Sequence, residues 1–334
     1  MNGNTNYDWL LAHEMSHMWW GNCVTERFWT DVWLSESFAT YSEAIWMESY
    51  GQAEYLNYVV NNIMKPYLYS GELFPIVEPE TPAQLWSATT YEKGASVLHM
   101  LRMIMGDTAF FTGYETYFAS HSYTTALTTD FIEHMEAQYG DLSWFFDQWV
   151  YGEGYPIYDI STDWVQLGSD WQLTINIGQT QTVSNFFTMP VEFHVEGTGA
   201  DSVITFLNDT QNQEEIFIIP FEPTTVEFDP DSRILSTAVM GVEEHTYPPQ
   251  GGVGTMYLGP NPATLSSTIN WQGTWNMELQ IRIYDLSGRI VRKRVLEPSS
   301  RNLDLAGIPA GTYLVDAIAP GNVRQTARLV ILAN

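Results

Sequence analysis

Two histidines near the start of the 334-residue chain are spaced for metal chemistry. The segment His13-Glu14-Met15-Ser16-His17 has the form H-E-x-x-H. On a helix, residues four apart lie one turn above each other, so both imidazoles can reach one ion. Glu14 then projects beside them, where it can accept a proton from a water molecule. The motif alone is moderately specific, and a polar helix face with two solvated histidines is the alternative interpretation.

A third ligand is expected from Glu36. Eighteen residues separate Glu36 from His17, enough for a helix end, a connection and the start of a returning helix. Its neighbours Trp33 and Phe38 indicate partial burial, and a buried acid needs a partner. Two His and one Glu, with the fourth position open to water, form a catalytic zinc arrangement. We therefore predict Zn²⁺ held by His13, His17 and Glu36. An ordinary surface glutamate is the alternative.

The elements that must position these residues are helices. Apolar residues recur at helical spacing through residues 7–155. The first predicted helix carries the motif and Leu10, with Asn6 or Asp8 as its cap. The further predicted helices span residues 33–49, 55–64, 91–105, 128–139 and 143–150, with Pro66 and Gly106 as helix stops. The first two of these helices would carry the two halves of the metal site.

The periodicity changes at Ile157, where apolar and polar residues begin to alternate. The alternating sets are Leu173/Ile175/Ile177, Val191/Phe193/Val195, Ile216/Ile218 and Val226/Phe228. This pattern is typical of short antiparallel strands in a sandwich. We predict a multidomain α + β fold: a helical domain at 1–156, a β-sandwich at 157–246, a Gly/Pro-rich linker at 247–256 and a small β-domain at 257–334.

The net charge of −27 is unevenly distributed. Residues 257–334 hold eight of the 13 Lys/Arg and five of the 40 Asp/Glu, a net charge of +3, which leaves −30 for residues 1–256. Phosphate binding needs clustered Lys/Arg, so the composition disfavours nucleic acid and anionic membranes as partners. The change of sign indicates a separate C-terminal module. The apolar runs are shorter than the roughly 18 residues of a membrane helix, so no membrane-spanning segment is predicted.

Cys23 is the only cysteine, so a metal site must rely on His, Asp and Glu. Its apolar neighbours indicate a buried, inert thiol. Residues 1–6 lack the basic and apolar regions of a signal peptide. The histidines without ligand-like spacing are interpreted as surface or satisfied core residues: His99, His121, His134, His194 and His245.

These motifs resemble those of the aminopeptidase N family of gluzincins. His13–Asn22 is similar to the zinc-helix signature of the family, and Trp33–Tyr41 resembles its third-ligand helix. Family members usually read W-L-N-E-G-F-A in that helix, and this chain departs from the pattern with Ser35 and Ser37. Asp31 also matches.

The resemblance continues along the chain. Tyr91-Glu92-Lys93-Gly94-Ala95 matches the family's Y-x-K-G-A, and Ser143–Pro156 is similar to the close of its catalytic domain. Residues 157–243 resemble the β-sandwich that follows. In all, the resemblance covers roughly residues 7–243.

The resemblance implies a zinc metallopeptidase of aminopeptidase type, which hydrolyses N-terminal peptide bonds by metal-activated water. Glu14 would take the proton of the water and pass it to the leaving amine. Tyr91 would donate a hydrogen bond to the developing oxyanion, a contact typically worth about 3 kcal/mol; a core or capping tyrosine is the alternative. Glu43, seven residues after Glu36 on the same helix face, would orient a ligand or be a solvated acid.

Two features of the family are not found in this sequence. Family members carry an N-terminal β-domain and a G-x-M-E-N segment whose Glu binds the free α-amine of the substrate. We therefore expect a chain truncated at its N-terminus. The alternative function is a catalytically incompetent zinc-binding fragment, and an endopeptidase or epoxide hydrolase variant of the same site is a third possibility.

Three motifs near the C-terminus resemble the sorting domain of type IX secretion substrates. They are Leu258–Ala263, Ile283–Arg289 and Gly307–Tyr313, in the expected order. The resemblance implies the type IX secretion machinery as a partner, and export across the outer membrane of a Bacteroidota-type bacterium to the cell surface or medium. A small carbohydrate-binding or adhesive sandwich is the alternative.

Overall fold

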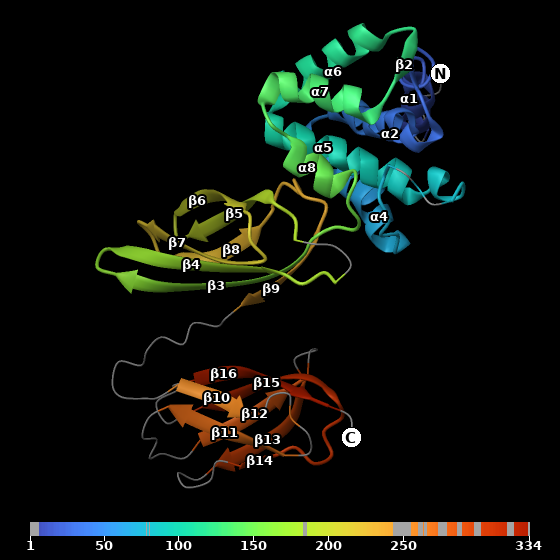
Figure 1. Ribbon diagram of the computed structural model, residues 1–334. Coiled ribbons are helices and arrows are strands. Elements are labelled where there is room, and N and C mark those ends of the chain that lie inside the picture. Colours follow the sequence, from blue (N-terminus) through green and yellow to red (C-terminus); the bar gives the residue numbers. More distant parts are fainter. Residues whose placement is uncertain are drawn as a thin grey trace. The chain divides into compact units, whose positions relative to one another are not determined.

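The computed structural model describes residues 7–77, 79, 81–182, 186–242, 255–259, 263, 266–272, 279–285, 289–296, 302–318 and 324–332. The chain divides into two units, Met1–Val242 and Glu243–Asn334 (Figure 1). Each unit has its own hydrophobic core. None of the helices in the described ranges combines the length and apolar character needed to cross a bilayer. The N-terminal residues 1–6, where no signal peptide is expected, lie outside the described ranges.

The first unit begins with a group of helices joined by short 3₁₀ and π-helical turns. The helices are α1 (Asp8–Ser16), α2 (Trp33–Glu48), α3 (Gln52–Tyr58), α4 (Lys65–Ser70), α5 (Gly94–Met105), α6 (Asp107–His121), α7 (Thr128–Tyr139) and α8 (Ser143–Trp149). The turns are η1 (Trp29–Asp31), η2 (Val59–Met64), η3 (Gln84–Trp86) and η4 (Thr89–Lys93), and β1 (Val24–Glu26) pairs in parallel with β2 (Thr124–Ala126).

Aromatic packing fixes the position of α2. Phe38 stacks on Tyr114 of α6 and meets Phe131 of α7 edge to face, with ring centroids 5.0 Å apart in both pairs. Such pairs stabilise a core beyond the area that they bury. Glu36 precedes Phe38 by two residues, about 200° around the helix, so the same packing turns Glu36 to the opposite side.

The observed helices differ from the predicted ones in two places. Pro66 does not end the helical segment: the π-helical turn η2 runs to Met64, and α4 starts at Lys65 with Pro66 in its first turn. A proline is tolerated there because its missing N–H has no intrahelical partner. Helix α6 is not among the predicted helices. Its buried residues Phe110, Tyr114 and Tyr117 do follow helical spacing, but the further aromatics of α6 blur the apolar stripe.

A β-sandwich completes the first unit. Its strands are β3 (Ile157–Leu167), β4 (Asp170–Gln179), β5 (Met189–Gly197), β6 (Ala200–Asn208), β7 (Asn212–Ile219), β8 (Pro223–Phe228) and β9 (Thr237–Val242). One sheet has the order β7-β4-β3-β9 and the other β6-β5-β8. The sandwich is not wholly antiparallel as predicted, because β9 pairs with β3 in parallel. Ile216 and Ile218 of β7 are more than half exposed, so that alternating pair faces outward.

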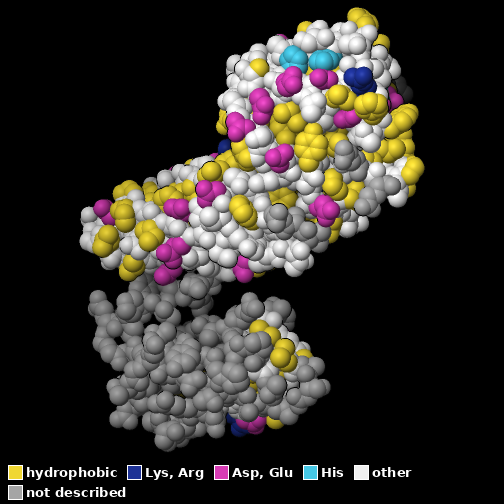
Figure 2. Space-filling model, in the orientation of Figure 1, with side chains coloured by type: hydrophobic (Ala, Val, Ile, Leu, Met, Phe, Trp, Pro, Cys, Tyr) yellow, Lys and Arg dark blue, Asp and Glu magenta, His cyan; other side chains and the backbone are white. Residues whose placement is uncertain are grey.

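The helices and the sandwich share one continuous core. Trp149 of α8 packs on Phe187, with ring centroids 4.5 Å apart. His99 of α5 lies 3.0 Å through Nε2 from the Ser232 carbonyl oxygen. These contacts tie α5 and α8 to the loops of the sandwich. In Figure 2, Asp and Glu side chains are spread over the visible face of this unit, as its composition requires.

The second unit is a smaller set of antiparallel strands. They are β10 (Thr255–Gly259), β11 (Ser266–Gln272), β12 (Leu279–Tyr284), β13 (Ile290–Leu296), β14 (Asn302–Asp304), β15 (Gly311–Ile318) and β16 (Arg324–Ile331). The sheets have the orders β10-β11-β14 and β13-β12-β15-β16. Strand β10 already begins inside the expected linker, whose residues 247–254 lie outside the described ranges.

The three C-terminal motifs are described only in part. Residues 260–262 and 286–288 lie outside the described ranges. The third motif is a tight turn: Gly307 has a φ of +81°, and the Tyr313 hydroxyl donates to the Pro309 carbonyl oxygen at 2.8 Å. This internal bond accounts for a tyrosine at the end of the motif.

Candidate metal centre

The two histidines of the H-E-x-x-H motif and Glu36 meet at one point. His13 and His17 lie one turn apart on α1, with ring centroids 4.9 Å apart. Glu36, in the first turn of α2, places Oε2 at 3.6 Å from His13 Nε2 and at 3.5 Å from His17 Nε2. The three ligand atoms all lie within 4.8 Å of one another.

This cluster fits a zinc ion. Ligand atoms 2.0–2.2 Å from a tetrahedral zinc are separated from each other by about 3.3 Å, close to the distances between Glu36 Oε2 and the two Nε2 atoms. Two imidazole nitrogens and one carboxylate oxygen are also a donor set of catalytic zinc sites. His13, His17 and Glu36 can therefore hold the metal.

The other nitrogen of each imidazole has a partner that orients the ring. His13 Nδ1 donates to Glu43 Oε1 at 2.7 Å, and the other oxygen of Glu43 accepts a hydrogen bond from the Tyr58 hydroxyl. His17 Nδ1 donates to the Trp20 carbonyl oxygen at 3.0 Å. Since Nδ1 carries the hydrogen in both rings, Nε2 is left to bind the ion.

The electrostatics of the cluster favour a cation. Burial opposes a charge on His13, but hydrogen bonds with Glu36 and Glu43 raise its pKa to about 9. Burial likewise acts against the Glu36 carboxylate, yet the hydrogen bonds with His13 and His17 hold its pKa at about 2. A divalent cation would take the place of the imidazole protons, because a metal binds only neutral imidazole.

A cavity of about 480 Å³ adjoins the cluster. His13, Glu14 and Tyr91 are among the residues that line it. The Tyr91 ring is stacked against that of His13, with centroids 6.3 Å apart and planes at 15°. Burial, and then the negative charge of Glu36, raise the pKa of Tyr91, so its hydroxyl remains a hydrogen-bond donor at neutral pH.

Tyr91 is positioned by the close approach of η4 to α2. Tyr91 lies within the π-helical turn η4, a geometry frequent at functional sites. The Ser37 hydroxyl donates to the Thr90 carbonyl oxygen at 2.5 Å. A Cβ atom at Gly94 would lie 1.9 Å from Ser37 Oγ, so only glycine allows this approach. Ser37, one departure from the family pattern, thus binds the segment that carries Tyr91.

The structure brings all six predicted site residues to one place: His13, Glu14, His17, Glu36, Glu43 and Tyr91. Sequence reasoning missed two others. Tyr58 is distant in sequence and carries no motif, and Glu92 stands at the variable position of Y-x-K-G-A. Cys23 is half-buried rather than buried as expected. His245 lies outside the described residues.

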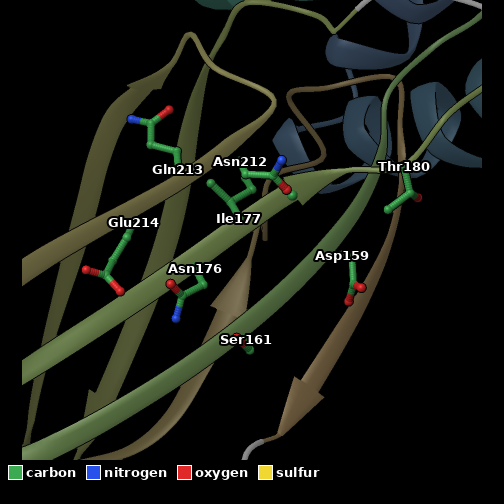
Figure 3. A pocket seen from close by; sticks show the side chains of 9 residues that line it. Asp159, Ser161, Asn176, Ile177, Thr180, Asn212, Gln213 and Glu214 are labelled. Carbon is green, nitrogen blue, oxygen red and sulfur yellow. The ribbon is translucent and has the colours of Figure 1, made fainter.

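A second hollow, of about 510 Å³, lies on the outer face of the sandwich (Figure 3). Asp159, Asn176 and Glu214 come from three strands, and their side chains do not converge on one point. The described residues that line the hollow include neither histidine nor cysteine. This hollow is about as large as the cavity beside the metal cluster, but the helices hold the groups capable of catalysis.

Comparisons with known proteins match two parts of the chain to known domain families. Residues 2–149 match the Peptidase family M1 domain, and residues 257–332 match the Secretion system C-terminal sorting domain. Curated relatives include a leucyl aminopeptidase of Saccharolobus solfataricus, 28% identical over 62% of this chain and 27% of the relative. Aminopeptidase N of Lactococcus lactis is 34% identical over 44% of this chain and 19% of the relative. The chain thus spans about a quarter or less of the curated relatives that it matches.

A solved structure shows a similar fold. Legionella pneumophila aminopeptidase A, crystallised in complex with aspartic acid, superposes with a TM-score of 0.58 at 20% identity. The superposition covers 69% of this chain and 26% of that chain. The mixed helical and sheet architecture therefore resembles that of an aminopeptidase.

Proposed function

We propose that this chain, which carries an M1 peptidase domain of the aminopeptidase N family and a secretion-system C-terminal sorting domain, is the zinc-binding catalytic part of an exported aminopeptidase. The observation that carries the proposal is the convergence of His13, His17 and Glu36, from two helices, on one point beside a cavity. The substrate would be a peptide or protein with a free N-terminus.

Zinc, when bound, would supply Lewis-acid chemistry and a more acidic water. Glu14, next to the ligand His13 on α1 and lining the same cavity, acts as the general base and then donates the proton to the leaving amine. The Tyr91 hydroxyl donates a hydrogen bond to the oxygen on which charge develops. Glu43 acts through His13 by holding its ring.

The domain organisation belongs to the same proposal. Residues 1–156 would form the catalytic helical domain, 157–246 the accompanying sandwich and 257–334 the sorting domain. The match over 257–332 supports export by a type IX secretion system to the cell surface or medium.

The test is a Glu14→Gln variant, with Glu54→Gln on the exposed surface of α3 as its matched control. Hydrolysis of aminoacyl-arylamides and of their N-acetylated counterparts is measured together with bound zinc. We expect one zinc per chain in all variants, turnover of free-amine substrates only, and a loss of activity of about 10²–10⁴-fold in Glu14→Gln alone.

Unchanged turnover in Glu14→Gln would reject the proposed mechanism. Zinc binding without turnover by the wild-type chain would favour the alternative of a non-catalytic zinc-binding segment.

A further inference from the structure

We propose that Glu72 is a positioning residue for the proposed reaction: its carboxylate holds the first residue of η4 and so places the Tyr91 hydroxyl beside the metal centre. The inference rests on the proposed function and adds a residue to it. Glu72 lies between α4 and η3, is not among the described residues that line the cavity, and belongs to none of the sequence motifs.

One oxygen of Glu72 accepts two hydrogen bonds from Thr89. Glu72 Oε2 lies 2.8 Å from the Thr89 backbone nitrogen and 2.9 Å from Thr89 Oγ1. Thr89 is fully buried and Glu72 is half-buried, so water has little access to these donors. Hydrogen bonds to an ionised acceptor are stronger than those between neutral groups. The carboxylate therefore fixes the backbone and the side chain of Thr89 at once.

The turn that receives these hydrogen bonds needs support from outside. Thr89 is the first residue of η4, which continues into α5 at Gly94. The first N–H groups of a helix have no intrahelical partner, and a carboxylate at that end also meets the positive end of the helix dipole. A π-helical turn is rare, so contacts with the surrounding structure are expected to stabilise it. Glu72 supplies such a contact.

Glu72 is itself held in place on both sides. The chain leaves α4 through Gly71, whose φ of +73° is the left-handed conformation favoured by glycine at a helix end. The Glu72 N–H donates to Ser70 Oγ at 3.1 Å. Four residues later, the Ile76 N–H donates to the Val150 carbonyl oxygen at 3.0 Å. The segment that carries Glu72 can therefore act as a fixed support for η4.

The position of Thr89 determines that of Tyr91. Tyr91 follows Thr89 by two positions within η4, and its ring is stacked against that of His13. Ser37 of α2 binds the intervening carbonyl group, that of Thr90. Two different segments thus hold consecutive residues of the same turn. Because a displacement of about 1 Å can lower turnover about 100-fold, loss of the Glu72 contact should reach the chemistry through Tyr91.

The hydrogen bonds of Glu72 can be separated from its charge. Burial is the main cause of the raised pKa of Glu92, about 7, and repulsion from Glu43 and Glu72 adds to it. Glu72→Gln removes the charge and keeps an acceptor oxygen for Thr89, whereas Glu72→Ala removes both. Recovery in the glutamine variant would therefore assign the effect to the hydrogen bonds.

The experiment compares Glu72→Ala and Glu72→Gln with the wild type, with Glu54→Ala on the exposed surface of α3 as the matched control. kcat and KM for an alanyl-arylamide are measured in these proteins, and in Tyr91→Phe with and without Glu72→Ala. Amide hydrogen exchange of the peptide that covers η4 is followed by mass spectrometry. Circular dichroism and zinc content show that each variant is folded and loaded.

In Glu72→Ala we expect kcat to fall about 10- to 100-fold with KM within about threefold, because the Tyr91 hydroxyl no longer meets the developing oxyanion. Glu72→Gln should recover most of kcat, and Glu54→Ala should match the wild type. In Tyr91→Phe, adding Glu72→Ala should lower kcat by less than about twofold, since the group that Glu72 positions is gone. Exchange in η4 should be about tenfold faster in Glu72→Ala than in the wild type.

An unchanged kcat in Glu72→Ala would overturn the proposal. An equal fall of kcat with and without the Tyr91 hydroxyl would do the same, because Glu72 would then act on another group. A Glu72→Gln variant as impaired as Glu72→Ala would also overturn it. Absence of turnover in the wild type would reject the proposed function. Faster exchange in Glu72→Ala alone would then still support the hold of Glu72 on η4, and unchanged exchange would overturn it.

Discussion

Glu43 Oε1 lies 2.7 Å from His13 Nδ1, and Glu36 Oε2 lies 3.6 Å from Nε2 of the same ring. Glu43 follows Glu36 by seven positions on α2, close to two full helical turns, so the two glutamates share one face of that helix. One face of α2 therefore supplies both a ligand for the ion and the carboxylate that orients another ligand. The tyrosine that bonds the second oxygen of Glu43 extends this arrangement into α3.

Removing the Glu43 carboxylate should weaken metal binding without removing a ligand. In Glu43→Ala the His13 ring loses the acceptor of its Nδ1 hydrogen, and we expect zinc affinity to fall about 10- to 100-fold. Competition with a chromophoric chelator measures this change. Tyr58→Phe, which removes only the hydrogen bond to Glu43, should cause a smaller loss. Equal affinity in Glu43→Ala and wild type would show that Glu43 is an ordinary helix acid.

Removing the Tyr91 hydroxyl should affect turnover and not metal binding. Tyr91→Phe keeps the ring that stacks against His13, so zinc content and fold should match the wild type. Loss of a donor to the developing oxyanion lowers kcat by about 10²–10³-fold, with little change in KM. Steady-state kinetics on an alanyl-arylamide measure both constants. A kcat within threefold of wild type would assign Tyr91 to packing alone.

Acid should destabilise the first unit through His99. The ring is fully buried; it accepts from the Tyr55 hydroxyl at 2.8 Å through Nδ1 and donates to the Ser232 carbonyl oxygen. Burial lowers the pKa of His99 from 6.5 to about 4. The unfolded chain therefore binds this proton first as pH falls, and the stability present above pH 6.5 is lost between pH 6.5 and 4.

The contribution of His99 to the loss of stability in acid can be measured apart from that of other titrating groups. Between pH 7.5 and 5 it should lower the free energy of unfolding by about 2 kcal/mol, at about 1.4 kcal/mol for each pH unit below 6.5. Urea titrations of wild type and His99→Gln at both pH values give the difference, with His194→Gln as the control. The same loss in His99→Gln as in wild type would refute a neutral buried imidazole.

The proximity of His13, His17 and Glu36 could be predicted from sequence because the signals for it are mostly local to each helix. His13 and His17 are one helical turn apart, and the aromatic and apolar neighbours of Glu36 indicated that its helix was packed. Tyr58 and Glu92 could not be predicted in the same way. Their proximity to the site depends on how α3 and η4 pack on α2, and no local spacing encodes that packing.

The fold likewise has features that local sequence patterns predict and features that they do not. The alternation in β4 and β5 predicted strands, and both have a buried inner face. The parallel pairing of β9 with β3 depends on the path of the chain between these two strands. The spacing of apolar residues predicts strands but not which strands pair. The helix α4, which starts at Lys65, was not predicted either. A proline disrupts the interior of a helix but is compatible with the first turn, where Pro66 lies.

The contact between Gly94 and Ser37 gives a further test of how Tyr91 is placed. In Gly94→Ala the new Cβ atom meets Ser37 Oγ, and one helix must move away from the other. Overpacking of this kind costs about 1–3 kcal/mol. Ser37→Gly alone should cost about 1–2 kcal/mol, since it loses the hydrogen bond to Thr90 and places glycine inside α2.

If the contact between the new Cβ atom and Ser37 Oγ destabilises Gly94→Ala, the losses of stability in Gly94→Ala and Ser37→Gly cannot be additive. Ser37→Gly removes both the Oγ atom and the Cβ atom that a residue-94 side chain would meet. The double variant should therefore be more stable than the sum of the single effects predicts, by about 1 kcal/mol or more. Urea unfolding of the four proteins measures the coupling. In the double variant, turnover should also recover relative to Gly94→Ala, because η4 returns Tyr91 to its place beside His13. Strict additivity would mean that Gly94 is required for a reason other than its approach to Ser37.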